Sequence, residues 1–215
     1  MKESIDHQID RNLTAQTKTR YNRAAPYYDL MEIISERTFS SWRRELLAFA
    51  KGKVLEVGVG TGKNFPYYPD GVDVTGLDIA DKMLFQAQLR ADKLGFPVHL
   101  MEGDVQSLPF PENSFDTAVA TFVFCSVPNP VLGLKELGRV VRSSGEILLL
   151  EHVRIDRPVI GLLMDLLNPA FVHLLGPNIN RRTVENVEKA GLLIQSIEHL
   201  GPMQMVKMIL AHPGK

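Results

Sequence analysis

The sequence has little cysteine, little net charge and no long apolar run. Cys125 is the single cysteine among 215 residues, which excludes an intrachain disulfide and a metal cluster built on cysteine thiolates. The formal net charge is −1, so no general attraction to nucleic acid is expected. No stretch reaches the ~18 consecutive apolar residues of a transmembrane helix, and the polar residues 1–20 have no signal-peptide core. We therefore expect a cytoplasmic globular protein, with peripheral membrane contact as an addition considered below.

Three glycines stand close together in one stretch, residues 54–65, around which the rest of the chain is organised. A buried strand is predicted over 54–57, and Gly58, Gly60 and Gly62 follow at alternate positions. Glycines there leave the inner wall of the turn without side chains, so a ligand can contact bare backbone. The pattern predicts a strand, a glycine-rich turn and then a helix whose first N–H groups face an anion.

The residues after this turn narrow the class of ligand-binding motif to which the turn can belong. A second apolar strand, predicted over 72–77, ends on Asp78, where a carboxylate can accept hydrogen bonds from a ribose diol. A dinucleotide-binding turn would have glycine where Lys63 stands. A phosphate-binding loop would have Ser or Thr after that lysine, where Asn64 stands. The spacing therefore argues against both of these nucleotide-binding motifs.

Strands and helices alternate from residue 53 to about 153, which predicts an α/β fold with a doubly wound, mostly parallel sheet. Strands are expected near residues 54–57, 72–77, 98–101, 117–123 and 147–150, with two closing strands near 192–200 and 205–211. Helices are expected near residues 39–49, 82–94, 130–140 and 183–190.

Ligands of such sheets bind beyond the carboxyl ends of the strands. The residues that fall at these ends are Gly58, Asp78, Asp104, Thr121 and Glu151. Their shared position predicts a binding site at this edge of the sheet.

The run Glu56-x-Gly58-x-Gly60-x-Gly62 resembles the first motif of the class I S-adenosylmethionine (SAM) methyltransferases. The string Leu-Pro-Phe-Pro at 108–111, with Phe-Asp at 115–116, resembles the same family, and the likeness extends over residues 20–212. The resemblance implies a seven-stranded Rossmann-like fold, SAM as cofactor and no metal. It also implies that the glycine turn holds the amino-acid end of SAM, while Asp104 and Val105 contact the adenine. The cofactor-binding residues that it implies are Glu56, Gly58, Gly60, Gly62, Asn64, Asp78, Ile79, Met83, Gly103, Asp104, Val105, Thr121 and Phe122.

Residues 1–50 are expected to form a helical lid within the same domain as residues 51–215. Apolar residues four apart in residues 1–19 give one thin stripe, for which we expect a frayed helix; a docked lid or a membrane-touching helix is the alternative. The segment from Tyr21 to Asp29 resembles the entry segment that covers the active site in quinone and phospholipid methyltransferases. We expect aromatic rings of this segment in the core, and the hydroxyls of Tyr21 and Tyr28 at the site as catalytic candidates.

An apolar insertion is expected at residues 154–182, and within it residues 158–175 are almost wholly apolar. Pro169 is predicted to break this stretch into two helices. So apolar a segment could line a hydrophobic substrate tunnel, touch a membrane, contact a second copy or be core. We favour substrate or membrane contact over core.

The methyl acceptor needs a free lone pair, so a base is sought near the strand ends. His152 follows the fifth strand and titrates near neutrality, which makes it the first candidate; a structural histidine bonded to backbone is the alternative. Cys125 is expected as a small apolar filler near the methyl group, since no basic neighbour is visible that would activate it. Glu151 is expected to hold the lid. The residues expected near the substrate are Cys125, Ser126, Glu151, His173 and Arg181.

Three acceptors fit these resemblances. The glycine turn with the tyrosine-rich entry resembles bacterial phosphatidylethanolamine N-methyltransferases, so a phospholipid amine comes first. The strings at 122–127, 151–153, 168–170 and 178–181 resemble enzymes that methylate alkyl thiols, which come second. C-methylation of a quinol is third, since Glu-His-Val at 151–153 departs from the Glu-Phe-Ser of the quinone C-methyltransferases.

The partner expected is thus a small lipophilic or lipid substrate, without nucleic acid. A SAM-binding module without catalysis is the alternative from another class, and the oligomeric state stays open.

Overall fold

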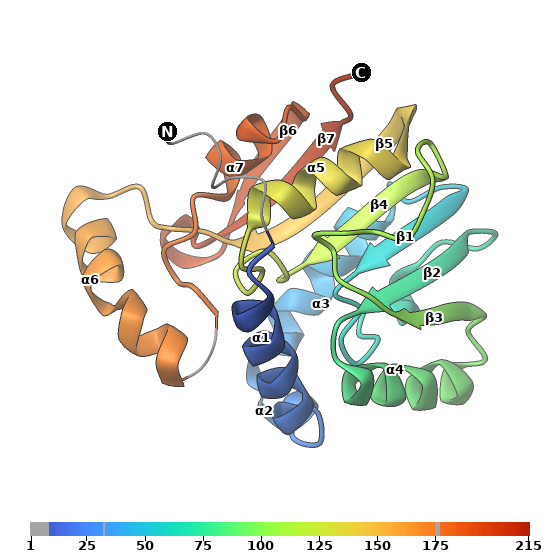
Figure 1. Cartoon of the computed structure of the whole chain (residues 1–215), viewed down its shortest axis with the longest axis horizontal. Helices are drawn as coiled ribbons and strands as arrows, with labels where there is room; N and C mark the ends of the chain where they lie inside the picture. The colour runs from blue at the N-terminus through green and yellow to red at the C-terminus, as the bar shows by residue number, and fades with distance from the viewer. Residues whose placement is uncertain (1–8, 32, 175–176) are drawn as a thin grey trace.

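The computed structural model describes residues 9–31, 33–174 and 177–215 (Figure 1). A seven-stranded sheet forms its centre, in the order β3-β2-β1-β4-β5-β7-β6. The strands are β1 Lys53–Val57, β2 Asp73–Asp78, β3 Val98–Glu102, β4 Phe115–Thr121, β5 Val141–His152, β6 Leu193–Leu200 and β7 Val206–His212. Strands β1 to β5 pair in parallel, and β7 pairs antiparallel with β5 and β6. The predicted α/β fold with a mostly parallel, seven-stranded sheet is confirmed.

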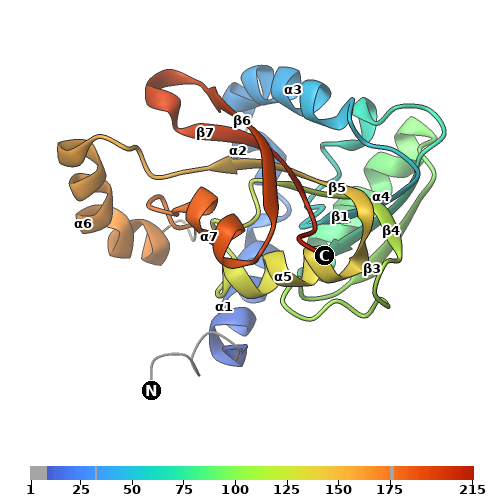
Figure 2. The ribbon, with the colours of Figure 1, turned by 90° about the horizontal axis from the view of Figure 1, so that it is seen from above.

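Helices cover both faces of the sheet, as Figure 2 shows. The helices are α1 Arg11–Ala24, α2 Tyr28–Met31, α3 Ile33–Leu47, α4 Asp81–Leu94, α5 Pro130–Val140, α6 Pro158–Leu174 and α7 Thr183–Lys189. Side chains alternate along β5: Ile147 and Leu149 pack under α5 and α7, while Leu148 and Leu150 pack under α3. Strands buried on both faces explain why the apolar runs of the sequence predict them so well.

Local signals fix the ends of the helices that cover the sheet. The side chain of Asn129 accepts a hydrogen bond from the N–H of Leu132 at 3.0 Å, and Pro130 begins α5. Gly95 ends α4 with φ 63°, and its N–H bonds the last carbonyls of that helix. These caps lie where the sequence predicts helix ends.

The helix expected directly after the glycine turn does not form, and that prediction is wrong. A 3₁₀ helix of three residues, Phe65–Tyr67, follows the turn, with Pro66 in its first positions. Tyr68 and Pro69 then lead to β2 without room for an α-helix. The turn is therefore not followed by the anion-facing helix start inferred from sequence. The main chain at Gly58 and Gly60 lines the cavity instead.

The first helix is docked on the domain, so the expectation of a frayed helix is wrong for residues 11–24. Asp10 caps α1 by accepting hydrogen bonds from the N–H groups of Asn12 and Leu13. The Lys18 ammonium pairs with Glu102 at the end of β3, and Asn22 donates to Asp81 at 2.7 Å. Ile5 of the predicted stripe lies outside the described residues.

The apolar segment forms one continuous helix, α6, and Pro169 lies inside it. Pro169 removes one helical hydrogen bond, at a cost of about 3 kcal/mol. Side-chain bonds in the turn before that position attach the helix to the rest of the domain: Asp165 accepts from Arg154 at 2.8 Å, and Asn168 donates to Asn178 at 3.0 Å. The predicted break is therefore wrong. In both views α6 stands apart from the sheet, on the side of the carboxyl ends of its parallel strands (Figures 1 and 2).

Candidate active site

A cavity lies beyond the carboxyl ends of β1, β2 and β4, where the sequence predicts a site. It encloses about 690 Å³ of empty space, counted together with the open solvent at its mouth. Ten of the residues predicted to bind the cofactor line it: Gly58, Gly60, Asp78, Ile79, Met83, Gly103, Asp104, Val105, Thr121 and Phe122. Helices α1 and α2 add Tyr21 and Tyr28 to the opposite wall.

The glycine turn presents bare backbone to this cavity. A Cβ atom on Gly58 would lie 2.5 Å from a methyl group of Val123, so no larger residue fits there. At Gly60 a Cβ atom would meet nothing closer than 3.9 Å, and the missing side chain leaves space on the cavity side. Both residues have positive φ angles, which only glycine adopts without strain. The turn therefore forms a cradle into which part of a ligand can fit against the main chain.

Asp78 is a buried carboxylate held in place by the backbone. One of its oxygens accepts the N–H of Gly60 at 2.8 Å and the other accepts the N–H of Ala80 at 2.9 Å. Burial raises the pKa of Asp78, and these backbone bonds oppose the rise. Each oxygen keeps a lone pair, so the carboxylate can accept further hydrogen bonds from hydroxyl groups in the cavity.

At the far wall, Asp104 is fixed by Gln106, which was not predicted. The backbone N–H of Gln106 donates to Asp104 at 2.9 Å, and its side-chain amide donates to the same carboxylate. The amide oxygen of Gln106 also accepts the N–H of Asn129 at 3.0 Å. Asp104 and its apolar neighbour Val105 thus face the cavity as a fixed pair.

Three predicted cofactor residues, Glu56, Gly62 and Asn64, are not among those that line the cavity. Glu56 is buried below the turn and accepts hydrogen bonds from Asn64 at 2.8 Å and from the Tyr68 hydroxyl at 2.8 Å. Burial raises the pKa of Glu56 to about 7. A Cβ atom on Gly62 would collide with the ring of Phe65. These residues support the turn from beneath.

The predicted base His152 is not among the residues that line the cavity. Its ring packs against the rings of Phe39 and Phe122, with centroids 5.7 and 4.6 Å away. Of these two ring neighbours Phe122 lines the cavity. The structure thus favours the structural alternative for this histidine.

Glu151 and Cys125 lie behind the cavity wall. Glu151 is fully buried and accepts the N–H groups of Val123 and Phe124 at 2.9 and 3.1 Å, so it holds the loop after β4 rather than the lid. Burial raises the pKa of Glu151 to about 8 and that of the Cys125 thiol to about 12. A thiol with such a pKa is not a nucleophile at neutral pH. Cys125 was expected beside the methyl group, but it is not among the residues that line the cavity.

Two further substrate candidates differ in their placement. Ser126 lines the cavity, and its Oγ lies 2.7 Å from the Tyr21 hydroxyl. Arg181 donates to the carbonyl of Val127 at 2.7 Å and is mostly buried, which lowers its pKa. The side chain of His173 lies outside the described part of the chain. No described residue of α6 lines the cavity, so the expected substrate tunnel is not built from this helix.

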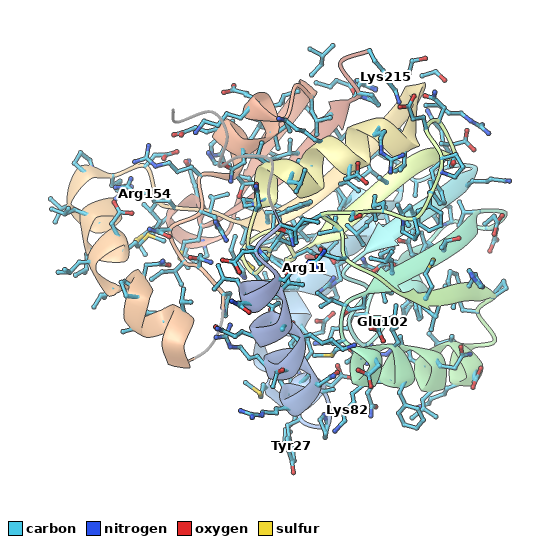
Figure 3. All side chains as sticks on the ribbon, in the orientation of Figure 1. Arg11, Tyr27, Lys82, Glu102, Arg154 and Lys215 are labelled. Atoms are coloured by element: carbon cyan, nitrogen blue, oxygen red, sulfur yellow. The ribbon has the colours of Figure 1, made fainter. Side chains whose placement is uncertain are left out.

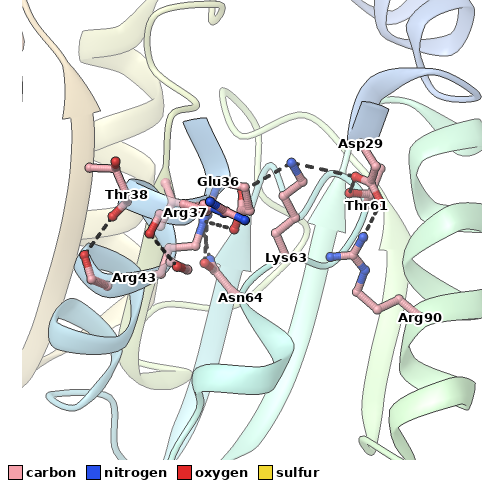
Figure 4. A network of polar contacts seen from close by, with 12 residues as sticks. Asp29, Glu36, Arg37, Thr38, Arg43, Thr61, Lys63, Asn64 and Arg90 are labelled. Carbon is pink, nitrogen blue, oxygen red and sulfur yellow. Dashed lines mark hydrogen bonds and ion pairs between the residues drawn. The ribbon is translucent and has the colours of Figure 1, made fainter. Parts of the chain in front are cut away.

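A polar network that sequence reasoning missed joins the N-terminal helices to the glycine turn (Figure 4). Arg43 is buried in α3 and donates to Asn64 at 2.9 Å and to the Thr121 hydroxyl at 2.7 Å. Lys63 lies between Glu36, at 3.3 Å, and Asp29, at 3.8 Å. Arg43 lies three and four residues before the core residues Leu46 and Leu47. The sequence signal that could have revealed this network is a charged residue, Arg43, on the apolar face of a predicted helix.

Asp29 closes the network at α2. It accepts the hydroxyl of Thr61 at 2.7 Å and pairs with Arg90 of α4. Lys63 also lies over the ring of Tyr28, 5.5 Å from its centroid. The wall that carries Tyr28 is therefore tied to the turn that carries Gly58 and Gly60. Among the described residues, no group of three or more His, Cys, Asp or Glu could hold a metal ion.

The fold and the cavity define an α/β enzyme that binds a nucleoside-containing ligand at the carboxyl ends of its strands. The methyltransferase domain family (Methyltransf_11) matches residues 55–149. Thiol S-methyltransferase TMT1A of Homo sapiens is 31% identical over 190 residues, covering 81% of this chain and 78% of that protein. The chain belongs to the SAM-dependent methyltransferases, and SAM is its cofactor.

Other relatives differ in their named substrates. Phosphatidylethanolamine N-methyltransferase of Cereibacter sphaeroides is 42% identical over 108 residues, which cover 49% of this chain and about half, 53%, of that protein. Demethylmenaquinone methyltransferase of Lactobacillus johnsonii is 33% identical over 175 residues, covering 74% of this chain and 71% of that protein. A solved SAM-dependent methyltransferase of Thermotoga maritima superposes with a TM-score of 0.70 at 18% identity, covering 93% of this chain and 100% of that one. That last likeness concerns the fold alone.

Proposed function

We propose that this methyltransferase transfers the methyl group of SAM to the amine of a phospholipid. One observation carries the proposal: the paired hydroxyls of Tyr21 and Ser126 line the same cavity as the apolar side chains of Val123, Val127 and Pro128. Such a wall suits an acceptor that has a small polar group on a lipophilic body. The 42% identity to a phosphatidylethanolamine N-methyltransferase supports this acceptor.

The residues of the cavity fit SAM by their chemistry. Bound SAM supplies a methyl group on a sulfonium, already activated for transfer. In our proposal the Asp78 carboxylate accepts the ribose hydroxyls, with its oxygens oriented by Gly60 and Ala80. Asp104 accepts the adenine amino group, and Val105 packs on the ring. The bare backbone at Gly58 and Gly60 leaves room for the amino-acid end.

The chain's part in the transfer is alignment. An amine N–H that donates to Ser126 or Tyr21 would hold the nitrogen lone pair in one direction. The titratable residues among those that line the cavity are Asp78, Asp104 and the two tyrosines. The two carboxylates face the cofactor in this arrangement. The amine proton is therefore proposed to leave to water beside the hydroxyl pair.

A methyl-transfer assay with labelled SAM tests the acceptor. Phosphatidylethanolamine vesicles should become labelled, whereas phosphatidylcholine vesicles should not, because their nitrogen is already fully methylated. An alkyl thiol and a demethylated quinol complete the set. Label in the quinol or thiol without label in phosphatidylethanolamine would contradict the phospholipid proposal.

A small alkyl thiol is the second candidate, favoured by a separate observation. The four strings that resemble thiol methyltransferases meet around the loop after β4. Asn178 donates to the carbonyl of Cys125 at 2.9 Å and accepts from Asn168, while Glu151 and Arg181 bond the same loop. A thiol with a pKa near ~8.5 also loses its proton more readily than an amine near ~10, so it needs no strong base.

A further inference from the structure

Helix α6 has its polar side turned toward the protein and its apolar side turned toward solvent. Asp165 accepts from Arg154 and from Asn180, at 2.8 and 3.1 Å, and Asn168 accepts the N–H of Ile179 at 2.9 Å. A Cβ atom on Gly161 would collide with the Arg154 guanidinium, so this charged group lies directly against the helix backbone. The helix is thus attached to the domain by polar contacts.

The opposite side of α6 is exposed and has no charge. Its large exposed residues are Val159, Leu162, Leu163, Leu166 and Leu167, of which Val159 is 81% exposed and Leu166 74% exposed. The other exposed residues of α6 among those described are two prolines and one alanine. A surface helix normally has the reverse arrangement, with its apolar stripe on the core. A contiguous apolar face of this kind needs a further contact.

We propose that the exposed face of α6 is a membrane-docking surface that lies in the head-group region of an anionic lipid bilayer. Within the described ranges, no helix has both the length and the apolar character that crossing a membrane requires. An interfacial helix instead buries one apolar face to a shallow depth. The five exposed aliphatic residues of α6 supply such a face.

Positive charge beside α6 fits an anionic surface. A pocket between the loop after β5, the start of α7 and β7 is lined by Arg154, Arg181, Arg182 and Lys207. Arg154, Arg182 and Lys207 pair with Asp165, Glu185 and Asp156, and Arg181 is mostly buried, while the Arg182 side chain stays 57% exposed. Arg157 is exposed directly before the helix. Basic residues next to an interfacial apolar face attract acidic head groups.

A second apolar group lies on the same side of the molecule. Tyr27, Leu30, Met31 and Ile33, around α2, are each more than 60% exposed. Figures 1 and 2 place α2 and α6 on the side of the carboxyl strand ends, and Figure 3 shows Tyr27 pointing away from the body of the protein. Since Tyr28 of α2 lines the cavity, a bilayer at this side would lie next to the catalytic cavity.

A second copy of the chain is a poorer occupant of this face. The 17 residues of α6 give a helix about 25 Å long and about 10 Å wide. The accessible surface of one half of such a cylinder is roughly 500 Å², against about 800 Å² per partner in a stable interface. A bilayer sets no such minimum, because each inserted side chain contributes separately.

Vesicle flotation of the purified full chain, without SAM, tests the proposal. The protein should float with vesicles of an equal mixture of phosphatidylcholine and phosphatidylglycerol, and less with phosphatidylcholine alone or at high salt. The double variant Leu162→Asp/Leu166→Asp should lower the bound fraction by roughly tenfold or more, since each buried leucine changes a partition ratio by about that factor. The matched control is Phe85→Asp/Leu89→Asp, which changes two exposed apolar residues with the same spacing on α4 and should float like the unchanged protein.

Binding of S-adenosylhomocysteine, measured by calorimetry, should be equal in both variants and would show that they are folded. Three results would overturn the proposal. The unchanged protein could stay unbound with both vesicle types, or the α6 variant could float normally. The unchanged protein could also be a dimer that the α6 substitutions dissociate, in which case a second copy covers α6. None of these readouts depends on the identity of the methyl acceptor.

Discussion

The hydroxyl of Tyr21 lies 2.7 Å from Oγ of Ser126, which joins the first helix to the loop after β4 across the cavity wall. Tyr21→Phe removes this contact and keeps the ring. We expect methyl transfer to slow about five- to tenfold, the effect of one lost hydrogen bond, with little change in cofactor affinity. Initial rates and calorimetry measure the two effects.

Two variants check this assignment. Ser126→Ala should act on the same bond, so the double variant should lose little more than either single one. Tyr27→Phe is the control, because Tyr27 is 65% exposed at the tip of α2. If Tyr21→Phe and Tyr27→Phe have equal rates, the hydroxyl pair has no part in transfer.

Asp78 is expected to determine cofactor affinity. Asp78→Ala removes the carboxylate that the N–H groups of Gly60 and Ala80 orient. Affinity for S-adenosylhomocysteine should fall by about 1–3 kcal/mol, the range for leaving a buried polar partner unpaired. Calorimetry on Asp73→Ala, at the exposed start of the same strand, provides the comparison. Unchanged affinity in Asp78→Ala would remove this residue from the site.

Glu151 gives the protein a pH-dependent stability. Its pKa is raised to about 8 in the folded state, against an ordinary value of 4.5, mainly by burial. Between these values the folded state holds a proton that the unfolded state has lost. The free energy of unfolding therefore falls as pH rises through this window, by up to about 1.4 kcal/mol per pH unit.

Glu151→Gln should flatten this decline, because the amide stays neutral and keeps the oxygen that accepts from Val123 and Phe124. Urea unfolding at about pH 5.5 and about pH 8.5 measures it. A smaller slope of the same sign should remain from Glu56, whose pKa is about 7. Glu198→Gln, on the exposed face of β6, should unfold like the unchanged protein. A slope as steep in Glu151→Gln as in the unchanged protein would contradict the assignment.

Arg43 is expected to stabilise the turn through the network of Figure 4. Arg43→Met leaves Asn64 and Thr121 without their shared donor. The free energy of unfolding should fall by about 2–3 kcal/mol. Arg44→Met, one position along and exposed, should cost far less in the same urea titration. Similar losses in both variants would mean that the buried contacts contribute little.

The sequence predicts this fold well because its strongest signals are local. Buried strands, glycine turns and helix caps all depend on residues close together in the chain. The two main errors arise where tertiary contacts decide. Pro66 and the short route to β2 leave no room for a helix after the turn. Asp165 and Asn168 attach α6 to the domain in the turn before Pro169, and the helix continues through that proline.

The site is predicted less completely, and the end of β5 shows why. Successive side chains of a strand point to opposite faces. Glu151 therefore points under the loop after β4, and His152 points toward Phe39 of α3. Position at a strand end brings a residue near the cavity, but the element packed over each face decides whether its side chain enters. That element can come from anywhere in the chain.

Helix α1 contributes to the cavity wall without being buried in the domain. None of its residues is buried, although Thr17 and Tyr21 form part of the cavity wall. Polar contacts attach it, among them the pair of Lys18 with Glu102. Exposed ion pairs contribute at most about 1 kcal/mol each and weaken with salt. Added salt is thus expected to weaken the attachment of α1 to the cavity wall, while the sheet, which is held by apolar burial, stays intact.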